Sequence, residues 1–275
     1  MVLLNLDTDT TLQKIEDVGK TTNVKPRNYL GMSQLGHNCE RFLNYYFRHC
    51  FTEDISAQSN RIFRTGHKAE DDMIADLKAA GITVYGEQDE YSIVSDHCRG
   101  HNDGIGIGFP EEPDKPHIIE FKTSNDTAFK KLLKEGVKVS KPMHYDQMTL
   151  YAHLKDLDHA MYMVLNKNTS QYYVEQVTID HEHAKSLIEK ADRIITQETL
   201  PQKIGGMSWF ECKWCSAYDI CQLNKPITPS CRNCKFVSIE EQGQWKCLKT
   251  DQFLDQYEPC GEYQLDQWLL GENNE

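Results

Sequence analysis

Two acidic residues and a lysine stand among predicted strand residues, and their types suit metal-dependent chemistry. Asp103 lies between two runs of alternating apolar and small or polar residues, 91–94 and 105–109. Glu120 and Lys122 are two positions apart in a predicted strand, so both side chains point to the same face. Two carboxylates beside an ammonium suit Mg²⁺ or Mn²⁺ next to a phosphate. This is chemistry that cleaves a phosphodiester bond.

The same residues also have a purely structural interpretation. Asp103 followed by Gly104 is typical of a tight turn. Glu120 and Lys122 are typical of an ion pair on a hydrated sheet face. The choice between the two interpretations depends on which other polar residues accompany them along the chain.

A helix predicted upstream supplies a third carboxylate. Its apolar residues follow the helical period, and Gly81 is suited to end it. These apolar residues are Ala69, Met73, Ile74 and Leu77. Glu70 then lies on or near the buried face, where an unpaired carboxylate would be costly and a bound metal would explain it. We expect His67, Asp71 and Asp72 on a solvated face of this helix.

A second predicted helix, over 144–154, carries two polar residues on one face. Gln147 and Tyr151 are four positions apart. An amide and a hydroxyl placed in this way can hold a phosphate or a base near a metal. The pair is also typical of a satisfied polar patch.

Taken in order, these residues resemble the PD-(D/E)XK nuclease superfamily, specifically its RecB-type branch. The resemblance covers about residues 30–220. The matching motifs are Gly66 with Glu70, the strand residue Asp103, Glu120 with Lys122, and Gln147 with Tyr151. Glu70 stands where many RecB-type members have histidine, and here the sequence is similar to lambda-type phage exonucleases, which use an acid.

The resemblance implies both a site and a fold. It implies a Mg²⁺ or Mn²⁺ site formed by Glu70, Asp103, Glu120 and the backbone carbonyl of Phe121. Lys122 would orient the attacking water or help to deprotonate it, and Gln147 and Tyr151 would complete the catalytic set. The implied fold is a restriction-endonuclease-like α/β core, with a central mixed sheet flanked by helices and a small C-terminal Cys-rich metal module.

The element pattern agrees with an α/β core. We expect a three-stranded run from about 83 to 122, strands at 161–165 and 172–177, and a helix near 184–196. The expected parts of the chain are an N-terminal arm at 1–27, a nuclease core at 28–225 and a Cys₄ zinc module at 226–275.

The cysteines form two sets. The chain has ten cysteines, a start without the features of a secretory signal, and no 18-residue apolar run, so we expect metal ligands rather than disulfides. The first set is Cys39 before the predicted core and Cys212, Cys215 and Cys221 after it. This arrangement resembles the iron–sulfur RecB-type nucleases, which include the AddB nuclease and the CRISPR-adaptation exonucleases. The resemblance implies a 4Fe–4S cluster on these thiolates, with zinc as the structural alternative, because four cysteines suit both.

The second set consists of Cys231, Cys234, Cys247 and Cys260. A Cys-x-x-Cys pair followed by two more cysteines predicts a small zinc module, whose fold a metal must stabilise because so short a segment buries little core. The cysteines also allow a different division between the two sets. Cys50 and Cys98 are expected to be small buried residues without a metal role.

The formal net charge of −12 argues against a broad nucleic-acid-binding surface, although a nuclease needs only a local basic track. A lysine-rich segment directly after the Glu-x-Lys motif is one candidate, with Lys130, Lys131 and Lys134 as its nucleic-acid-binding residues. Further candidates are Arg41, Arg48, Arg61 and Arg64, and the aromatic residues Tyr45, Tyr46 and Phe47 for base stacking. A solvated face and a buried core are the alternatives for these lysines and aromatic residues.

The sequence therefore indicates a metal-dependent deoxyribonuclease. The resemblance favours an exonuclease that acts on DNA ends or single strands in recombination, repair or DNA processing. The resemblance also allows a helicase or recombination partner. We expect a cytoplasmic location, in a bacterium or a phage-infected host, and no membrane contact. The alternatives are a non-catalytic nucleic-acid-binding module with structural metals, and a regulatory protein whose cluster senses redox state.

Overall fold

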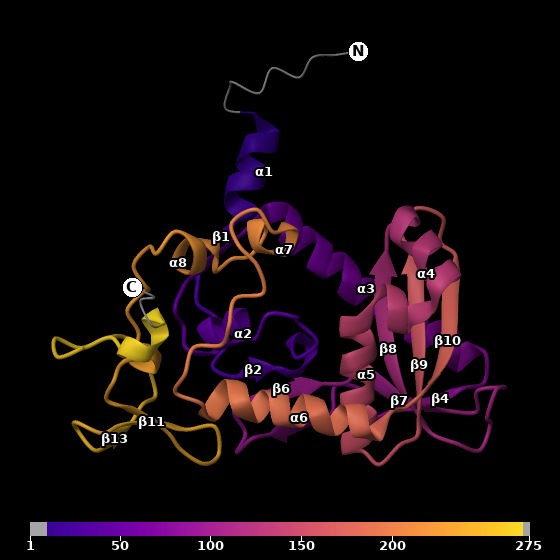
Figure 1. Cartoon of the computed structure of the whole chain (residues 1–275). Coiled ribbons are helices and arrows are strands. Elements are labelled where there is room, and N and C mark those ends of the chain that lie inside the picture. The colour runs from indigo at the N-terminus through magenta and orange to yellow at the C-terminus, as the bar shows by residue number, and fades with distance from the viewer. Residues whose placement is uncertain (1–9, 272–275) are drawn as a thin grey trace.

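A computed structural model describes residues 10–271 as an α/β fold built on one mixed sheet (Figure 1). The sheet has five strands in the order β10-β9-β8-β7-β4. Their bounds are Thr83–Tyr85 for β4, Gly104–Ile107 for β7, His117–Ser124 for β8, His159–Asn166 for β9 and Tyr172–Thr178 for β10. β8 and β9 are parallel, whereas the other neighbouring pairs are antiparallel. The prediction of a central mixed sheet flanked by helices is confirmed.

Helices cover both faces of this sheet. The long helices are α3 (Ala57–Ala79), α4 (Asp126–Ser140), α5 (Pro142–Leu154) and α6 (His181–Thr196). Successive residues of a strand point to opposite faces, so Ile119 packs with Met73 of α3 while Ile118 packs in the core that includes Met148 of α5. β8 is therefore buried on both sides, and it is the strand that carries Glu120 and Lys122.

The predicted helix that carries Glu70 is α3. The hydroxyl of Ser56 caps its start by accepting a hydrogen bond from the amide of Ser59 at 3.0 Å. The chain leaves the helix at Gly81, whose φ of +87° is a conformation that glycine adopts without strain. Ala69, Met73 and Leu77 are buried, as their spacing predicts. The helix begins nine residues earlier than Gly66, at Ala57.

The prediction of three strands between residues 83 and 122 is wrong. This segment contains five strands, β4 to β8, and two of them belong to a different sheet from the central one. β5 (Glu90–Ile93) and β6 (Cys98–His101) pair with β2 (Leu30–Gly31) in a separate three-stranded sheet. The turn between β5 and β6 has positive φ at Val94, Ser95 and Asp96. None of these three residues is the glycine that normally marks such a turn.

The segment expected to form an arm contains regular structure. Residues 1–9 lie outside the part of the chain that the structure describes. α1 (Thr11–Gly19) and β1 (Thr21–Val24) follow, and β1 pairs with β3 (Glu53–Ile55). No residue of α1 is buried, so the helix is held by polar contacts to α3, including an Arg61–Glu16 ion pair at 2.7 Å. Leu12, Ile15 and Val18 are three positions apart in α1, but all three are exposed, so this spacing does not mark a buried face.

The remaining elements are short helices and strands, and several of them carry or adjoin the cysteines of the two sets (Figure 1). They are η1 (Met32–Gln34), α2 (Glu40–Phe47), α7 (Phe210–Lys213), α8 (Tyr218–Gln222), η2 (Cys231–Asn233), β11 (Val237–Ile239), β12 (Trp245–Cys247), β13 (Gln252–Phe253) and η3 (Gln267–Leu270). The C-terminal module packs on α2 through Trp245, which is fully buried with its ring 5.1 Å from that of Phe47. Among the helices within residues 10–271, none is long and apolar enough to cross a membrane.

Candidate active site and cysteine clusters

β8 presents Glu120 and Lys122 on one face, and their side chains form an ion pair. The prediction that they share a face is confirmed. Glu120 is 0% exposed, because β8 lies between β7 and β9 and its face is covered by α5. The side chain of Lys122 is 29% exposed and reaches the solvent. A hydrated ion pair is therefore the wrong interpretation of Glu120.

Asp103 lies in the turn before β7 and is fixed against β8. Its Oδ2 accepts a hydrogen bond from the backbone amide of Phe121 at 2.7 Å. The next residue, Gly104, has φ +156°, and a Cβ there would meet Val84 Cγ1 at 3.3 Å. The chain bends at Asp103 where it passes from β6 in one sheet to β7 in another, and this bend brings the carboxylate next to the Glu-x-Lys motif.

Glu70 is half-buried on α3, and its Oε1 accepts a hydrogen bond from Gln88 Nε2 at 3.2 Å. Burial raises the pKa of the Glu70 carboxyl, and the negative charge of Asp103 raises it further. The two carboxylates are therefore close enough to repel each other. His67, Asp71 and Asp72 are exposed, as a solvated helix face predicts.

Gln147 and Tyr151, on α5, are both buried but make different contacts. Gln147 Nε2 donates a hydrogen bond to Oε2 of Glu120 at 3.0 Å. The Tyr151 ring lies 5.2 Å from that of Tyr91, and a Cβ at Gly100 would overlap the Tyr151 hydroxyl. Gln147 thus contacts Glu120 directly, whereas Tyr151 packs against the sheet formed by β2, β5 and β6.

The electrostatics of the acidic residues show an excess of negative charge. Burial raises the pKa of Glu120 to about 8, although the ammonium of Lys122 acts to lower it. Burial also raises the pKa of Asp103. For Lys122, burial acts to lower the pKa, but the carboxylates of Glu120 and Asp103 outweigh it and leave the pKa raised. Three carboxylates against one ammonium form a donor set that a divalent cation would neutralise.

Phe121 lies between Glu120 and Lys122, and its backbone is part of the site. Its amide is bound to Asp103, while its side chain is buried in the α3-facing core. Glu70, Asp103, Glu120 and this backbone carry oxygen donors, the ligand type that a hard cation prefers.

Sequence reasoning missed two residues near the site. Gln88 holds Glu70, as described above, and nothing in its sequence context marks it. His144 is half-buried on α5, with Nδ1 2.6 Å from the Tyr162 hydroxyl. Burial lowers the pKa of His144 to about 3, and the charge of Lys122 lowers it as well. Its position one helical turn before Gln147 is the signal that would have identified it.

The proposed basic residues are placed differently from one another. Lys130 and Lys131 are exposed on α4 and pair with acids of the same helix, Asp126 at 2.7 Å and Glu135 at 3.7 Å. Lys134 is also exposed. Arg48 is only 5% exposed, so its assignment to a DNA track is wrong.

The aromatic residues of α2, Tyr45, Tyr46 and Phe47, belong to the buried core. Base stacking by these residues is therefore excluded. Arg48, which follows them, is buried for the same reason, with its guanidinium 5.2 Å from the Trp268 ring. The C-terminal module packs over this end of α2. The sequence pattern of α2 alone does not predict this contact.

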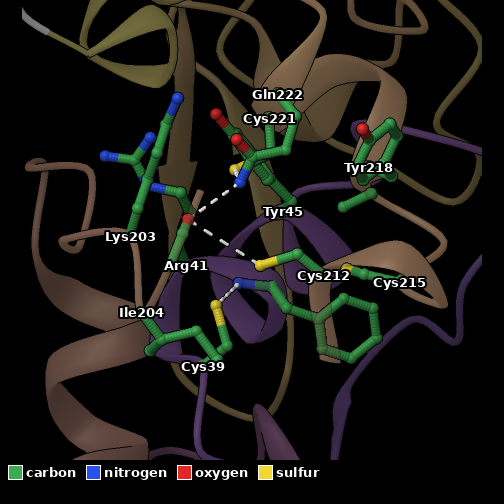
Figure 2. Close-up of a pocket in the computed structure, with 13 residues that line it drawn as sticks. Cys39, Arg41, Tyr45, Lys203, Ile204, Cys212, Cys215, Tyr218, Cys221 and Gln222 are labelled. Atoms are coloured by element: carbon green, nitrogen blue, oxygen red, sulfur yellow. Dashed lines mark hydrogen bonds between the residues drawn. The ribbon is translucent and has the colours of Figure 1, made fainter. Parts of the chain in front are cut away.

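The first cysteine set converges on one cavity. Figure 2 shows Cys39, Cys212, Cys215 and Cys221 lining it. Cys39 caps α2, with Sγ accepting a hydrogen bond from the Phe42 amide at 3.4 Å. Burial raises the pKa of Cys215 to about 11, and the other three thiols raise it further. The shared cavity therefore brings together residues that are more than 170 positions apart in the chain.

The second set also converges. Cys231, Cys234, Cys247 and Cys260 line one cavity in the C-terminal module. Burial raises the pKa of Cys231, followed by the effects of Cys234, Cys260 and Cys247. All ten cysteines are free thiols, and Cys50 and Cys98 are 0% exposed, as expected of small buried residues. The two sets line separate cavities, and each offers four sulfur donors, the ligand type that zinc centres and iron–sulfur clusters use.

No family model matches the sequence, and no curated protein matches it. Solved structures with a similar chain path include that of SSO0001, at 17% identity and a TM-score of 0.44, covering 78% of this chain and 95% of that chain. The alkaline exonuclease LHK-Exo from Laribacter hongkongensis is 14% identical, with a TM-score of 0.46, and LHK-Exo in complex with dAMP is 14% identical, with a TM-score of 0.45. Both LHK-Exo matches cover 61% of this chain and 86% of that chain.

Proposed function

We propose that this chain is a divalent-metal-dependent deoxyribonuclease of the PD-(D/E)XK type, from the RecB-type branch. The observation that carries the proposal is the meeting of three carboxylates with one lysine. Glu120 and Lys122 form an ion pair, Asp103 is bound to the amide between them, and Glu70 is close enough to Asp103 to shift its own pKa. Crowded carboxylates with raised pKa values are typical of functional sites.

Glu70, Asp103, Glu120 and the carbonyl of Phe121 would hold Mg²⁺ or Mn²⁺. Bound there, the ion supplies Lewis acidity to the phosphoryl oxygen and lowers the pKa of a water molecule. The carboxylate of Asp103 is held in place by the Phe121 amide, and that of Glu120 by Gln147. These residues are thus oriented before substrate arrives, which lowers the cost of assembling the site.

Lys122 keeps a positive charge beside the site, because the neighbouring carboxylates raise its pKa. Its ammonium is suited to bind the phosphate and to stabilise the negative charge that develops during cleavage. Its partial exposure leaves it accessible to a substrate. Tyr151 supports the site from below by packing rather than by contact with the phosphate.

DNA is the proposed substrate, bound at ends or as a single strand in recombination, repair or DNA processing. Lys134 and the exposed heads of Lys130 and Lys131 on α4 are the proposed phosphate-binding residues. Helix α4 directly follows β8, so the first of these lysines is within about ten positions of Lys122 in the sequence. A short track of this kind reconciles DNA binding with a net charge of −12.

The four thiols around Cys39 are proposed to hold a 4Fe–4S cluster, and those around Cys231 a zinc ion. The first set would tie α2 to α7 and α8, the segments before and after the nuclease core. The second would stabilise the Cys-x-x-Cys knuckle, the segment from Cys231 to Cys234. Its two middle residues, Arg232 and Asn233, are buried against the core.

The test is a purification without oxygen, followed by metal analysis and digestion of end-labelled DNA with Mg²⁺ or Mn²⁺. The decisive variant is Glu120→Gln, which keeps the volume of this buried side chain. Its matched control is Glu182→Gln, a change of the same chemistry at a site whose side chain is 82% exposed. Metal-dependent degradation by the wild type and the control, with loss in Glu120→Gln, supports the proposal.

The other outcomes separate the parts of the proposal. A colourless zinc protein that still degrades DNA retains the nuclease and removes the iron–sulfur cluster. DNA that stays intact under every condition but binds the protein favours the alternative, a non-catalytic nucleic-acid-binding module with structural metals. Partner binding that depends on oxidation, without cleavage, favours a redox-sensing protein.

A further inference from the structure

A second group of potential metal ligands lies at the start of β8 and β9. His117 is the first residue of β8 and His159 the first of β9, and these strands are parallel neighbours. Glu112 comes from the loop between β7 and β8. One ligand atom from each of these three residues lies within 4.8 Å of the other two. The parallel register brings the two histidines together, and the loop adds the carboxylate.

The contacts of these side chains leave the relevant atoms facing one another. Glu112 Oε2 lies 2.7 Å from His159 Nε2. His117 Nδ1 lies 3.0 Å from the carbonyl oxygen of Lys115, which can only accept, so Nδ1 carries the proton. Nε2 of His117 then carries the lone pair, which accepts a hydrogen bond from Gln176 Nε2 at 3.0 Å. A histidine that donates one ring N–H to a carbonyl and turns the other nitrogen inward has the usual arrangement of a metal ligand.

This group is separate from the proposed nuclease site. His117 has the same parity as Ile119 and Phe121, whose side chains pack in the core under α3. Glu120 and Lys122 point to the opposite face of β8. A single ion therefore cannot bind both groups.

We propose that Glu112, His117 and His159 form a binding site for a divalent transition-metal ion of the zinc class. Two imidazoles and one carboxylate are a donor set that zinc uses with three protein ligands and one further position. Zinc bonds of about 2.0–2.2 Å at tetrahedral angles place ligand atoms about 3.4 Å apart. The 2.7 Å separation of Glu112 and His159 thus has to widen only slightly.

Two neighbouring side chains modulate the site. Lys115 Nζ lies 2.8 Å from Glu112 Oε1 and 3.3 Å from His159 Nε2, so its positive charge competes with a metal ion. Gln176 Nε2 lies 3.2 Å from Glu112 Oε2 and 3.0 Å from His117 Nε2. Rotation of the Gln176 amide would turn its oxygen toward the ion as a fourth donor. Because the loop carries Glu112, binding would fasten it to the first residues of β8 and β9.

The experiment adds Co²⁺ to the full-length protein whose cysteine centres are already filled, in a Glu120→Gln background that weakens the carboxylate site by removing one of its three acids. Cobalt bound by nitrogen and oxygen shows visible bands without the near-ultraviolet absorption of a cobalt–thiolate bond, so the spectrum identifies the ligands. We expect one equivalent to bind. Affinity should fall at least tenfold in His159→Gln and in Glu112→Gln, and should rise in Lys115→Met, which removes the competing charge.

The outcomes decide the proposal in both directions. A spectrum with thiolate absorption, the absence of a nitrogen–oxygen spectrum, or equal affinity in wild type and Glu112→Gln would overturn it and leave a hydrogen-bond network only. Glu112 is half-buried in a loop, so Glu112→Gln keeps the test valid if His159→Gln does not fold. A zinc-dependent rise of the thermal midpoint, seen in the wild type and lost in Glu112→Gln, would support it independently.

Discussion

The side-chain amide of Gln147 donates to Oε2 of Glu120 at 3.0 Å, while Lys122 binds the other carboxylate oxygen. Both oxygens of a fully buried carboxylate therefore have a partner, one from α5 and one from the same strand. This arrangement fixes the orientation of Glu120. It also accounts for how an acid whose pKa is raised to about 8 by burial can remain in the core.

The first prediction concerns the contribution of Gln147. In Gln147→Ala, Oε2 of Glu120 is left buried without a donor, which costs about 1–3 kcal/mol. We expect DNA cleavage to fall at least about tenfold and the Mg²⁺ concentration for half-maximal rate to rise, because Glu120 binds its proton more tightly. Cleavage rates over a range of Mg²⁺ concentrations measure both effects.

Tyr151→Phe is the matched comparison for that variant, because Tyr151 lies one turn further along α5. Its hydroxyl packs over Gly100, so we expect its loss to change the rate by less than about threefold. A loss in Tyr151→Phe as large as in Gln147→Ala would instead assign Tyr151 a direct role in the reaction.

The second prediction separates the charge of Lys122 from metal binding. Lys122→Met removes the ammonium that is proposed to bind the phosphate, and we expect a fall in kcat of at least about 100-fold. The same change removes a positive charge beside the proposed cation, so the half-maximal Mg²⁺ concentration should not increase. Lys122→Arg, which keeps the charge, should recover part of the rate. A raised Mg²⁺ requirement with unchanged kcat would contradict this role.

Much of the central architecture is readable from local sequence. The spacing of Ala69, Met73 and Leu77 gives α3 and its buried face, and the position of Gly81 gives its end. The strand period alone places Glu120 and Lys122 on one face. These features depend on residues a few positions apart, where backbone geometry fixes the relation between side chains.

Other features depend on contacts between distant segments, and local patterns do not predict them. α1 has no buried residue and is held by α3. Arg48 is buried because Trp245 and Trp268 cover it from the C-terminal module. The approach of Glu112 to the two histidines needs the pairing of β8 with β9, which no short motif encodes.

The third prediction uses the double role of Cys39, which caps α2 and is a proposed cluster ligand. Serine is a good N-cap, so Cys39→Ser keeps the hydrogen bond to the Phe42 amide while removing one thiolate. We expect the helix content to be unchanged and the iron content to fall, as measured by circular dichroism and metal analysis after anaerobic purification. Cys98→Ala, a buried cysteine outside both sets, should keep its iron. Full iron retention in Cys39→Ser would remove Cys39 from the ligand set.

The last prediction concerns acid stability and His49, which is 2% exposed and lies where the knuckle meets α2. His49 Nε2 is 3.1 Å from Arg232 Nη1 and 3.0 Å from the carbonyl oxygen of Arg27, so a protonated imidazole would lie directly beside a buried positive charge. Burial lowers the pKa of His49 to about 3, and the charge of Arg232 lowers it further.

At pH values below the ordinary histidine pKa of 6.5, His49 therefore binds a proton in the unfolded chain but not in the folded protein. The free energy of unfolding falls as the pH drops below 6.5, and the stability is fully present only above it. At pH 5.5 the loss from this one residue is about 1.4 kcal/mol relative to pH 7.5. Urea unfolding at the two pH values measures this loss of unfolding free energy. In His49→Gln the loss should be smaller than in the wild type by about this amount. His144 also has a lowered pKa but titrates in both proteins, so its effect cancels in the comparison. Equal losses in the two proteins would show that His49 is not held neutral by Arg232.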